Sequence, residues 1–243
     1  MLVASWNLNN RVGRTKFRLE AANAATTLGA DVLVFNEYYP KEHEANFSRI
    51  LSDAGWAHQL VSRNTGVPAN RVLIASRRDL VHLDVALPQF DQQFPSNILW
   101  VAVPSIGVSI VGVRVPWYEG DEMPLVASAW NWLESTARGL SDRPSIILGD
   151  LNVSLNSSRS RGGEHFRRLL QSGWHRATPA QGASFFGDGA KQSEIDHILG
   201  NAQISLSNTR YVTDSGGYQL AGGPDALSDH AALLSEIAVA TNA

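Results

Sequence analysis

The chain has 243 residues, of which 44% are hydrophobic and 18% charged, with a net charge of −3 and no cysteine. These values are typical of a globular protein with a full hydrophobic core, and they exclude disulfides, thiolate metal sites and a cysteine nucleophile. The slightly negative charge argues against a protein that coats nucleic acid by charge alone.

The sequence contains no obvious targeting or anchoring segment. No apolar run reaches membrane-spanning length, and the start "MLVASWNLNN" lacks the basic and apolar regions of a signal peptide. We therefore expect a cytoplasmic monomer without a membrane anchor. Because no linker, charge block or repeat divides the chain, we expect a single domain over residues 1–243.

The predicted elements are strands interrupted by a few helices. Apolar residues at helical spacing predict helices over residues 15–30, 42–55, 122–140 and 163–173. Apolar runs bounded by turn residues predict strands over residues 2–6, 31–37, 70–77, 80–87, 97–104, 107–116, 144–150, 193–200, 204–212 and 231–239. This order fits an α+β fold in which two packed sheets carry helices on their outer faces.

Polar side chains stand at the tips of five predicted strands. They are Asn7, Glu37, Asp150 with Asn152, Asp196, and Asp229 with His230. Each one alone is typical of a turn, a helix cap or a surface pair. Five together indicate one shared site.

The residue types at these tips suit phosphoester chemistry. Oxygen ligands from Glu37, Asp229, Asn7 and Asp150 suit a hard divalent cation such as Mg²⁺. Hydrolysis also needs a carboxylate that orients or deprotonates water, for which Asp150 is the candidate. Asn152 and a protonated His230 are candidate donors to the developing charge, and Asp196 is available to hold His230 protonated.

In their order along the chain, "SWNLNN", "VFNE", "GDLN", "EIDH" and "SDH" resemble the signature of the endonuclease/exonuclease/phosphatase superfamily. The resemblance implies a four-layer α/β/β/α sandwich and a phosphoesterase that uses Mg²⁺ or Mn²⁺. It implies that Glu37 binds metal with Asn7 beside it, and that Asp229 is a second carboxylate of the metal region. It also implies that Asp150 activates water, Asn152 holds the phosphate, and Asp196 pairs with the catalytic His230.

The sequence departs from the family pattern at Arg114 in "VGVRVPWYEG". Family members carry a His or a Tyr at that strand end, shortly before a Pro. We hypothesise that Arg114 grips phosphate oxygens, since its guanidinium is planar and always charged. The alternative is an ion pair with an acid at the rim, such as Glu119.

Other residues are candidates for contacts with an extended substrate. Trp117 and Tyr118 are expected to stack bases or to pack under a loop. Arg159 and Arg161 follow "GDLN" and are expected either to contact neighbouring phosphates or to be solvated. Less certain candidates are Asn70, Arg63 and Arg71 at the rim, and Phe185 or Phe186, which border the pocket or pack in the core.

We therefore predict a phosphodiester hydrolase dependent on Mg²⁺ or Mn²⁺, most simply a nuclease acting on DNA or RNA. One alternative is a phosphomonoesterase or a sphingomyelinase-like phospholipase of the same fold, although no exposed apolar loop for a membrane stands out. Another is a non-catalytic binding protein that keeps the fold. It ranks lower because Glu37, Asp150, Asn152 and His230 are all present.

Overall fold

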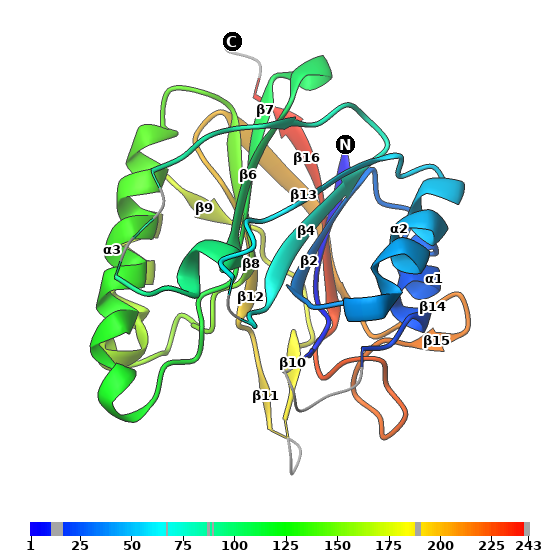
Figure 1. Cartoon of the computed structure of the whole chain (residues 1–243). Helices are drawn as coiled ribbons and strands as arrows, with labels where there is room; N and C mark the ends of the chain where they lie inside the picture. The colour runs from blue at the N-terminus through cyan, green and yellow to red at the C-terminus, as the bar shows by residue number, and fades with distance from the viewer. Residues whose placement is uncertain (11–16, 67, 87, 89, 188–190, 241–243) are drawn as a thin grey trace.

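The computed structural model describes residues 1–10, 17–66, 68–86, 88, 90–187 and 191–240. Among these residues, two six-stranded sheets pack face to face and helices cover their outer faces (Figure 1). This arrangement confirms the predicted α/β/β/α sandwich. No helix in the described ranges is long and apolar enough to cross a bilayer.

The strand order of each sheet mixes segments from distant parts of the chain. The first sheet runs β13 (Ile204–Val212), β16 (Ala232–Val239), β1 (Leu2–Asn7), β2 (Val32–Tyr38), β4 (Arg71–Ser76) and β3 (His58–Val61). The second runs β5 (Val81–His82), β6 (Ile98–Val103), β7 (Val108–Val113), β8 (Ser145–Asp150), β12 (Asp196–Gly200) and β9 (His175–Arg176). Two short hairpins pair β10 (Phe185–Phe186) with β11 (Gln192–Ser193), and β14 (Asp214–Ser215) with β15 (Tyr218–Gln219).

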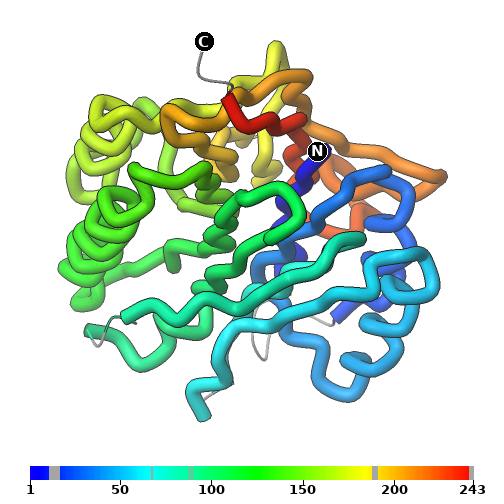
Figure 2. The backbone as a smooth tube through the Cα atoms, turned by 90° about the horizontal axis from the view of Figure 1, so that it is seen from above, coloured from blue at the N-terminus to red at the C-terminus, as the bar shows by residue number. Residues whose placement is uncertain are grey.

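The helices lie in pairs. α1 (Glu20–Thr26) and α2 (Glu44–Asp53) cover the first sheet, and α3 (Pro124–Gly139) and α4 (Gly163–Gln171) cover the second. Figure 2 shows the two halves from above, with the red C-terminal strand beside the blue N-terminal strand. Short 3₁₀ turns complete the helical structure at Lys41–His43, Phe94–Asn97, Pro104–Ile106, Gly120–Glu122 and Arg159–Arg161.

Alternating side chains of the strands build separate apolar layers. On β2, Leu33 and Phe35 pack in the cluster shared with α1 and α2, whereas Val32 and Val34 pack in the cluster between the sheets. Because successive side chains of a strand point to opposite faces, a strand buried on both faces reads as a continuous apolar run. This explains why apolar and polar residues do not alternate along the segment "DVLVFNE".

Strand direction places particular strand ends at one edge of the sandwich. β1 runs parallel to β2 in the first sheet, and β7 runs parallel to β8 in the second. The carboxyl ends of parallel neighbours lie at the same edge. β12 is antiparallel to β8, and β16 is antiparallel to β1, so each contributes its amino end to the edge where its partner strand ends.

Candidate active site

The polar tips predicted from the sequence come together where these strand ends meet. Asn7 ends β1, Glu37 lies near the end of β2, and Asp150 ends β8. Asp196 begins β12 directly opposite Asp150, and His230 precedes β16. The site therefore joins both sheets.

The backbone is unusual where two of these side chains point into the site. Glu37 has φ +54° and lies within a register shift of the β2–β4 ladder, as expected of a bulge that redirects a side chain. Asn152 has φ +49°. Non-glycine residues in this region cost about 1–3 kcal/mol and cluster at functional sites. Gly149 is required, because an added Cβ would lie 1.9 Å from the carbonyl oxygen of Val113.

Asp150 is buried and held by three neighbouring residues. Its Oδ2 accepts hydrogen bonds from Nδ2 of Asn7 at 2.9 Å and from Nδ2 of Asn152 at 3.1 Å. Its Oδ1 accepts from the backbone N of Asn152 at 3.0 Å, and its own N–H donates to Oδ1 of Asn36 at 2.9 Å. Burial raises the pKa of Asp150 to about 7, and the negative charge of Asp196 acts in the same direction.

Asn152 uses both hydrogens of its amide within the protein. Besides the bond to Asp150, Nδ2 donates to the carbonyl oxygen of Val115 at 2.8 Å. Asn152 thus orients the Asp150 carboxylate, and it reaches a phosphate only by giving up one of these bonds.

His230 and Asp196 form a buried pair, with His230 Nδ1 and Asp196 Oδ2 2.7 Å apart. Burial alone lowers the pKa of His230, but the charge and hydrogen bond of Asp196 outweigh it and raise this pKa to about 10. His230 is therefore an imidazolium at neutral pH. Its Nε2 lies 3.6 Å from Oδ1 of Asp229.

Arg114 points into the site from just beyond β7. Its Nη2 lies 2.8 Å from Oε1 of Glu37, and its Nε lies 3.9 Å from Oδ2 of Asp150. The alternative of an ion pair with an acid therefore forms, with Glu37 in place of Glu119; Glu119 accepts a hydrogen bond from Nε1 of Trp117. The guanidinium therefore lies between the predicted metal ligand and the predicted base.

The donor set at Glu37 fits a hard cation that keeps waters. Oε2 of Glu37 is buried and has no hydrogen-bond partner among the described residues. Asn7, which lies opposite Asn36 on the neighbouring strand, offers the neutral oxygen Oδ1, which accepts one hydrogen bond from the N–H of Asn9. Within the described ranges, no three Asp, Glu or His side chains are grouped closely enough to hold a metal by themselves. Mg²⁺ commonly binds one or two carboxylates, substrate oxygens and water. The participation of Asp229 stays a prediction.

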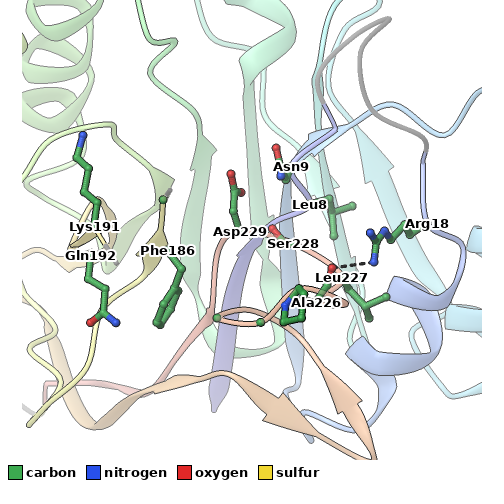
Figure 3. Close-up of a pocket in the computed structure, with 14 residues that line it drawn as sticks. Leu8, Asn9, Arg18, Phe186, Lys191, Gln192, Ala226, Leu227, Ser228 and Asp229 are labelled. Atoms are coloured by element: carbon green, nitrogen blue, oxygen red, sulfur yellow. Dashed lines mark hydrogen bonds between the residues drawn. The ribbon is translucent and has the colours of Figure 1, made fainter. Parts of the chain in front are cut away.

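A pocket of about 720 Å³ opens beside Asp229 (Figure 3). It lies between the β10–β11 hairpin and residues 222–228, with Phe186, Leu227 and Lys191 in its lining. Arg18 also lines it, and its Nη1 donates to the carbonyl oxygen of Ala226 at 2.7 Å. The two aromatic candidates therefore have different positions. Phe186 borders the pocket, whereas Phe185 packs against His230, with ring centroids 5.1 Å apart.

The aromatic residues after Arg114 have different surroundings. Trp117 is 48% exposed, and the guanidinium of Arg161 stacks 3.7 Å from its ring centroid. Tyr118 is buried, and its hydroxyl donates to Asp91 at 2.8 Å. The expectation that Tyr118 stacks bases at an exposed rim is therefore wrong, because its ring packs in the core and its hydroxyl has a protein acceptor.

The other predicted rim residues have mainly local contacts. Arg159 is exposed and pairs with Glu164 at 2.9 Å. Arg71 lies over the Tyr38 ring, and Arg63 lines a separate pocket. The backbone oxygen of Asn70 accepts from the Ser96 hydroxyl. Substrate contacts by Arg159 and Asn70 stay predictions.

Sequence reasoning missed Ser228 as an organiser of the site. Its hydroxyl donates to the carbonyl oxygen of Asn7 at 2.7 Å and accepts the N–H of His230 at 3.0 Å. Nε1 of Trp6 donates to the carbonyl oxygen of His230 at 2.8 Å. These bonds tie the end of β1 to His230. The only signal was that Ser228 belongs to the motif "SDH".

Comparisons with known proteins show the family and the fold of the chain. The model of the family described as "Endonuclease/Exonuclease/phosphatase family" matches residues 4–230. Similar solved structures include an AP endonuclease from Archaeoglobus fulgidus, with a TM-score of 0.70, 16% identity, and coverage of 98% of this chain and 100% of that one. The 3′-5′ exonuclease NExo from Neisseria meningitidis has a TM-score of 0.69 and 21% identity, with coverage of 97% and 99%.

One curated protein matches part of the chain. It is NADH:(hydroxy)cinnamate reductase subunit CrdA from Vibrio ruber, which is 26% identical over 125 residues. The match covers 46% of this chain and 61% of that protein. At this identity over less than half of the chain, the match assigns no activity.

Proposed function

Because the chain belongs to the Endonuclease/Exonuclease/phosphatase family, we propose that it hydrolyses phosphate diesters with a divalent cation and that its substrate is a nucleic acid. The observation that carries this proposal is the convergence of Asp150, Arg114 and the His230–Asp196 pair at one edge of the sandwich. A carboxylate and two cations around one point suit an anionic substrate attacked by water.

Asp150 is the base of the proposed reaction. Its Oδ atoms accept the proton of the attacking water, and a pKa of about 7 suits proton transfer near neutral pH. Hydrogen bonds from Asn7 and Asn152 fix the orientation of the carboxylate. Any nearby divalent cation would lower this pKa and increase the ionised fraction.

His230 and Arg114 supply the positive groups. The imidazolium of His230, held at Nδ1 by Asp196, can donate from Nε2 to a phosphate oxygen. Arg114 can donate to phosphate while keeping its charge, but it cannot act as a general acid. Glu37 and Asn7 would hold Mg²⁺ or Mn²⁺, which supplies charge neutralisation at phosphorus when bound.

Features around the site favour an extended nucleic-acid substrate. Trp117 is exposed with Arg161 stacked on it, and an exposed aromatic beside a phosphate site is a surface on which bases stack. Beside Asp229, the pocket lined by Phe186 and Lys191 has room for an ester substituent of the scissile phosphate. Arg159 is exposed and pairs with Glu164, and in this proposal it contacts a neighbouring phosphate of the substrate.

The proposal is tested with bis-p-nitrophenyl phosphate in Mg²⁺ or Mn²⁺. We expect hydrolysis by the wild type and a loss of about 10²- to 10⁴-fold in Asp150→Asn, which removes the base. Arg49→Gln is the matched control, because Arg49 is exposed and pairs with Asp53 on the surface of α2. Wild-type inactivity in every divalent metal, or full activity of Asp150→Asn, would contradict the proposal.

A substrate panel then identifies the natural class. It comprises abasic duplex DNA, single-stranded DNA, plasmid, RNA, inositol phosphates and sphingomyelin. We expect a nucleic acid to be cleaved with the highest kcat/KM. Preferential hydrolysis of inositol phosphates or sphingomyelin would replace the nuclease by the phosphomonoesterase or phospholipase alternative.

A further inference from the structure

A nearly buried ion pair lies at the centre of the candidate site. Arg114 is 16% exposed and Glu37 is 9% exposed, and their charged atoms are 2.8 Å apart. Arg114 follows β7 of the second sheet, whereas Glu37 lies on β2 of the first. The bond therefore fixes the Glu37 side chain from the opposite sheet.

The two carboxylate oxygens of Glu37 have different surroundings. Oε1 contacts Arg114, whereas Oε2 is buried without a hydrogen-bond partner among the described residues. A buried carboxylate oxygen is costly unless something compensates its charge. Arg114 thus leaves one oxygen of Glu37 for a second cation and fixes the direction in which it points.

From this geometry we infer that Arg114 is a positioning residue that shares Glu37 with the divalent cation and weakens the binding of that cation. The inference rests on the proposed function, in which Glu37 is the metal ligand. Arg114 holds a fixed positive charge next to the oxygen that the metal would use. Two cations on one carboxylate repel each other, and the repulsion is strong in a site shielded from water.

The other charges near the pair do not cancel this effect. Asp150 lies 3.9 Å from Nε of Arg114 and attracts both cations alike. His230 is positive and is already paired with Asp196. A neutral side chain at position 114 removes the repulsion but leaves the remaining charges in place, so its main effect is on metal affinity.

The test measures Mn²⁺ binding to the substrate-free protein by electron paramagnetic resonance. The signal of aqueous Mn²⁺ decreases as the ion binds to the protein. We expect Arg114→Gln to bind Mn²⁺ about tenfold more tightly than the wild type, because it loses the repelling charge. Arg114→Lys keeps the charge and is expected to bind like the wild type. Arg49→Gln, an arginine outside the site, is the matched control and should not change the affinity. Equal or weaker binding by Arg114→Gln would overturn the inference.

Two further variants assign the effect to Glu37 and guard against misfolding. Adding Glu37→Gln to Arg114→Gln should abolish the gain, and retained tight binding would show that the metal binds elsewhere. Arg114→Tyr places a different neutral side chain at this position, and it should also bind Mn²⁺ more tightly. Unchanged affinity in a folded Arg114→Tyr protein would overturn the inference even if Arg114→Gln does not fold.

Kinetics separate this inference from the proposed function. In Arg114→Gln, the Mn²⁺ concentration for half-maximal activation should fall, and kcat should fall as well. General structural damage would lower kcat without making the metal bind more tightly. Wild-type hydrolysis with unchanged metal affinity in Arg114→Gln would refute the role of Arg114 alone. Absence of both hydrolysis and Mn²⁺ binding in the wild type would refute the proposed function and, with it, this inference.

Discussion

His197 is a buried group whose protonation should make the fold sensitive to acid. It lies on β12 beside Asp196, with its ring 4.6 Å from that of Phe166. Its Nε2–H donates to the carbonyl oxygen of Val153 at 2.7 Å, so it anchors the loop that follows Asn152. Burial lowers the pKa of His197 from 6.5 to about 4, and the positive charge of Arg176 acts in the same direction.

The size of the effect follows from the two pKa values of His197. Because the folded value lies below the unfolded one, the unfolded chain takes up a proton below pH 6.5 that the folded chain refuses. Stability present above pH 6.5 is therefore lost as the pH falls toward 4. The loss from this single group is about 1 kcal/mol at about pH 5.5 and about 2–3 kcal/mol at about pH 4.5.

The substitution His197→Gln tests this reasoning. A glutamine amide can still donate to Val153 but does not titrate. Free energies of unfolding are measured with urea at about pH 7.5, 5.5 and 4.5 for both proteins. We expect the wild type to lose about 2–3 kcal/mol more than His197→Gln over this range. Parallel curves for the two proteins, whatever their absolute stabilities, would refute a buried neutral His197.

Two further predictions concern the pair in the site and the core. Asp196→Asn removes the charge that holds His230 protonated, so burial should dominate and the pKa of His230 should fall well below about 10. An NMR titration of the ring proton of His230 measures this pKa. An unchanged titration would contradict the pairing of His230 with Asp196. Phe47→Ala deletes a fully buried ring that packs against Phe17 and Tyr38, and it should cost about 3–5 kcal/mol in urea unfolding. A cost below about 1 kcal/mol would mean that this layer repacks.

The sheet strands and the polar tips were predictable because their signals are local. Continuous apolar runs such as "DVLVFNE" and "PSIILGD" indicate strands buried on both faces. A carboxylate or amide directly after such a run stands out, which is how Glu37 and Asp150 were found. Their convergence followed from the number of tips and from the family resemblance.

The remaining features depend on contacts that no local pattern encodes. β3 has four half-buried residues at a sheet edge, so its apolar signal is weak. Among the described residues of the apolar run over residues 80–87, which leave out residue 87, only Val81–His82 form a strand. Trp117 and Tyr118 are adjacent and aromatic, yet Tyr118 is buried and donates to Asp91, whereas Trp117 is 48% exposed and donates to Glu119. The bond between Arg114 and Glu37 likewise depends on how the two sheets pack.

The bonds that tie β1 to the segment before β16 have a consequence for synthesis of the protein. Trp6 and His230 are separated by 224 positions along the chain, yet they share a hydrogen bond inside the site. A nascent polypeptide whose residue 230 is still inside the ribosome lacks the imidazolium of His230. It also lacks the hydrogen bond that joins Trp6 on β1 to His230. In the proposed function, hydrolysis therefore requires that β16 has paired with β1, so a nascent chain has no complete site until the residues of β16 have left the ribosome.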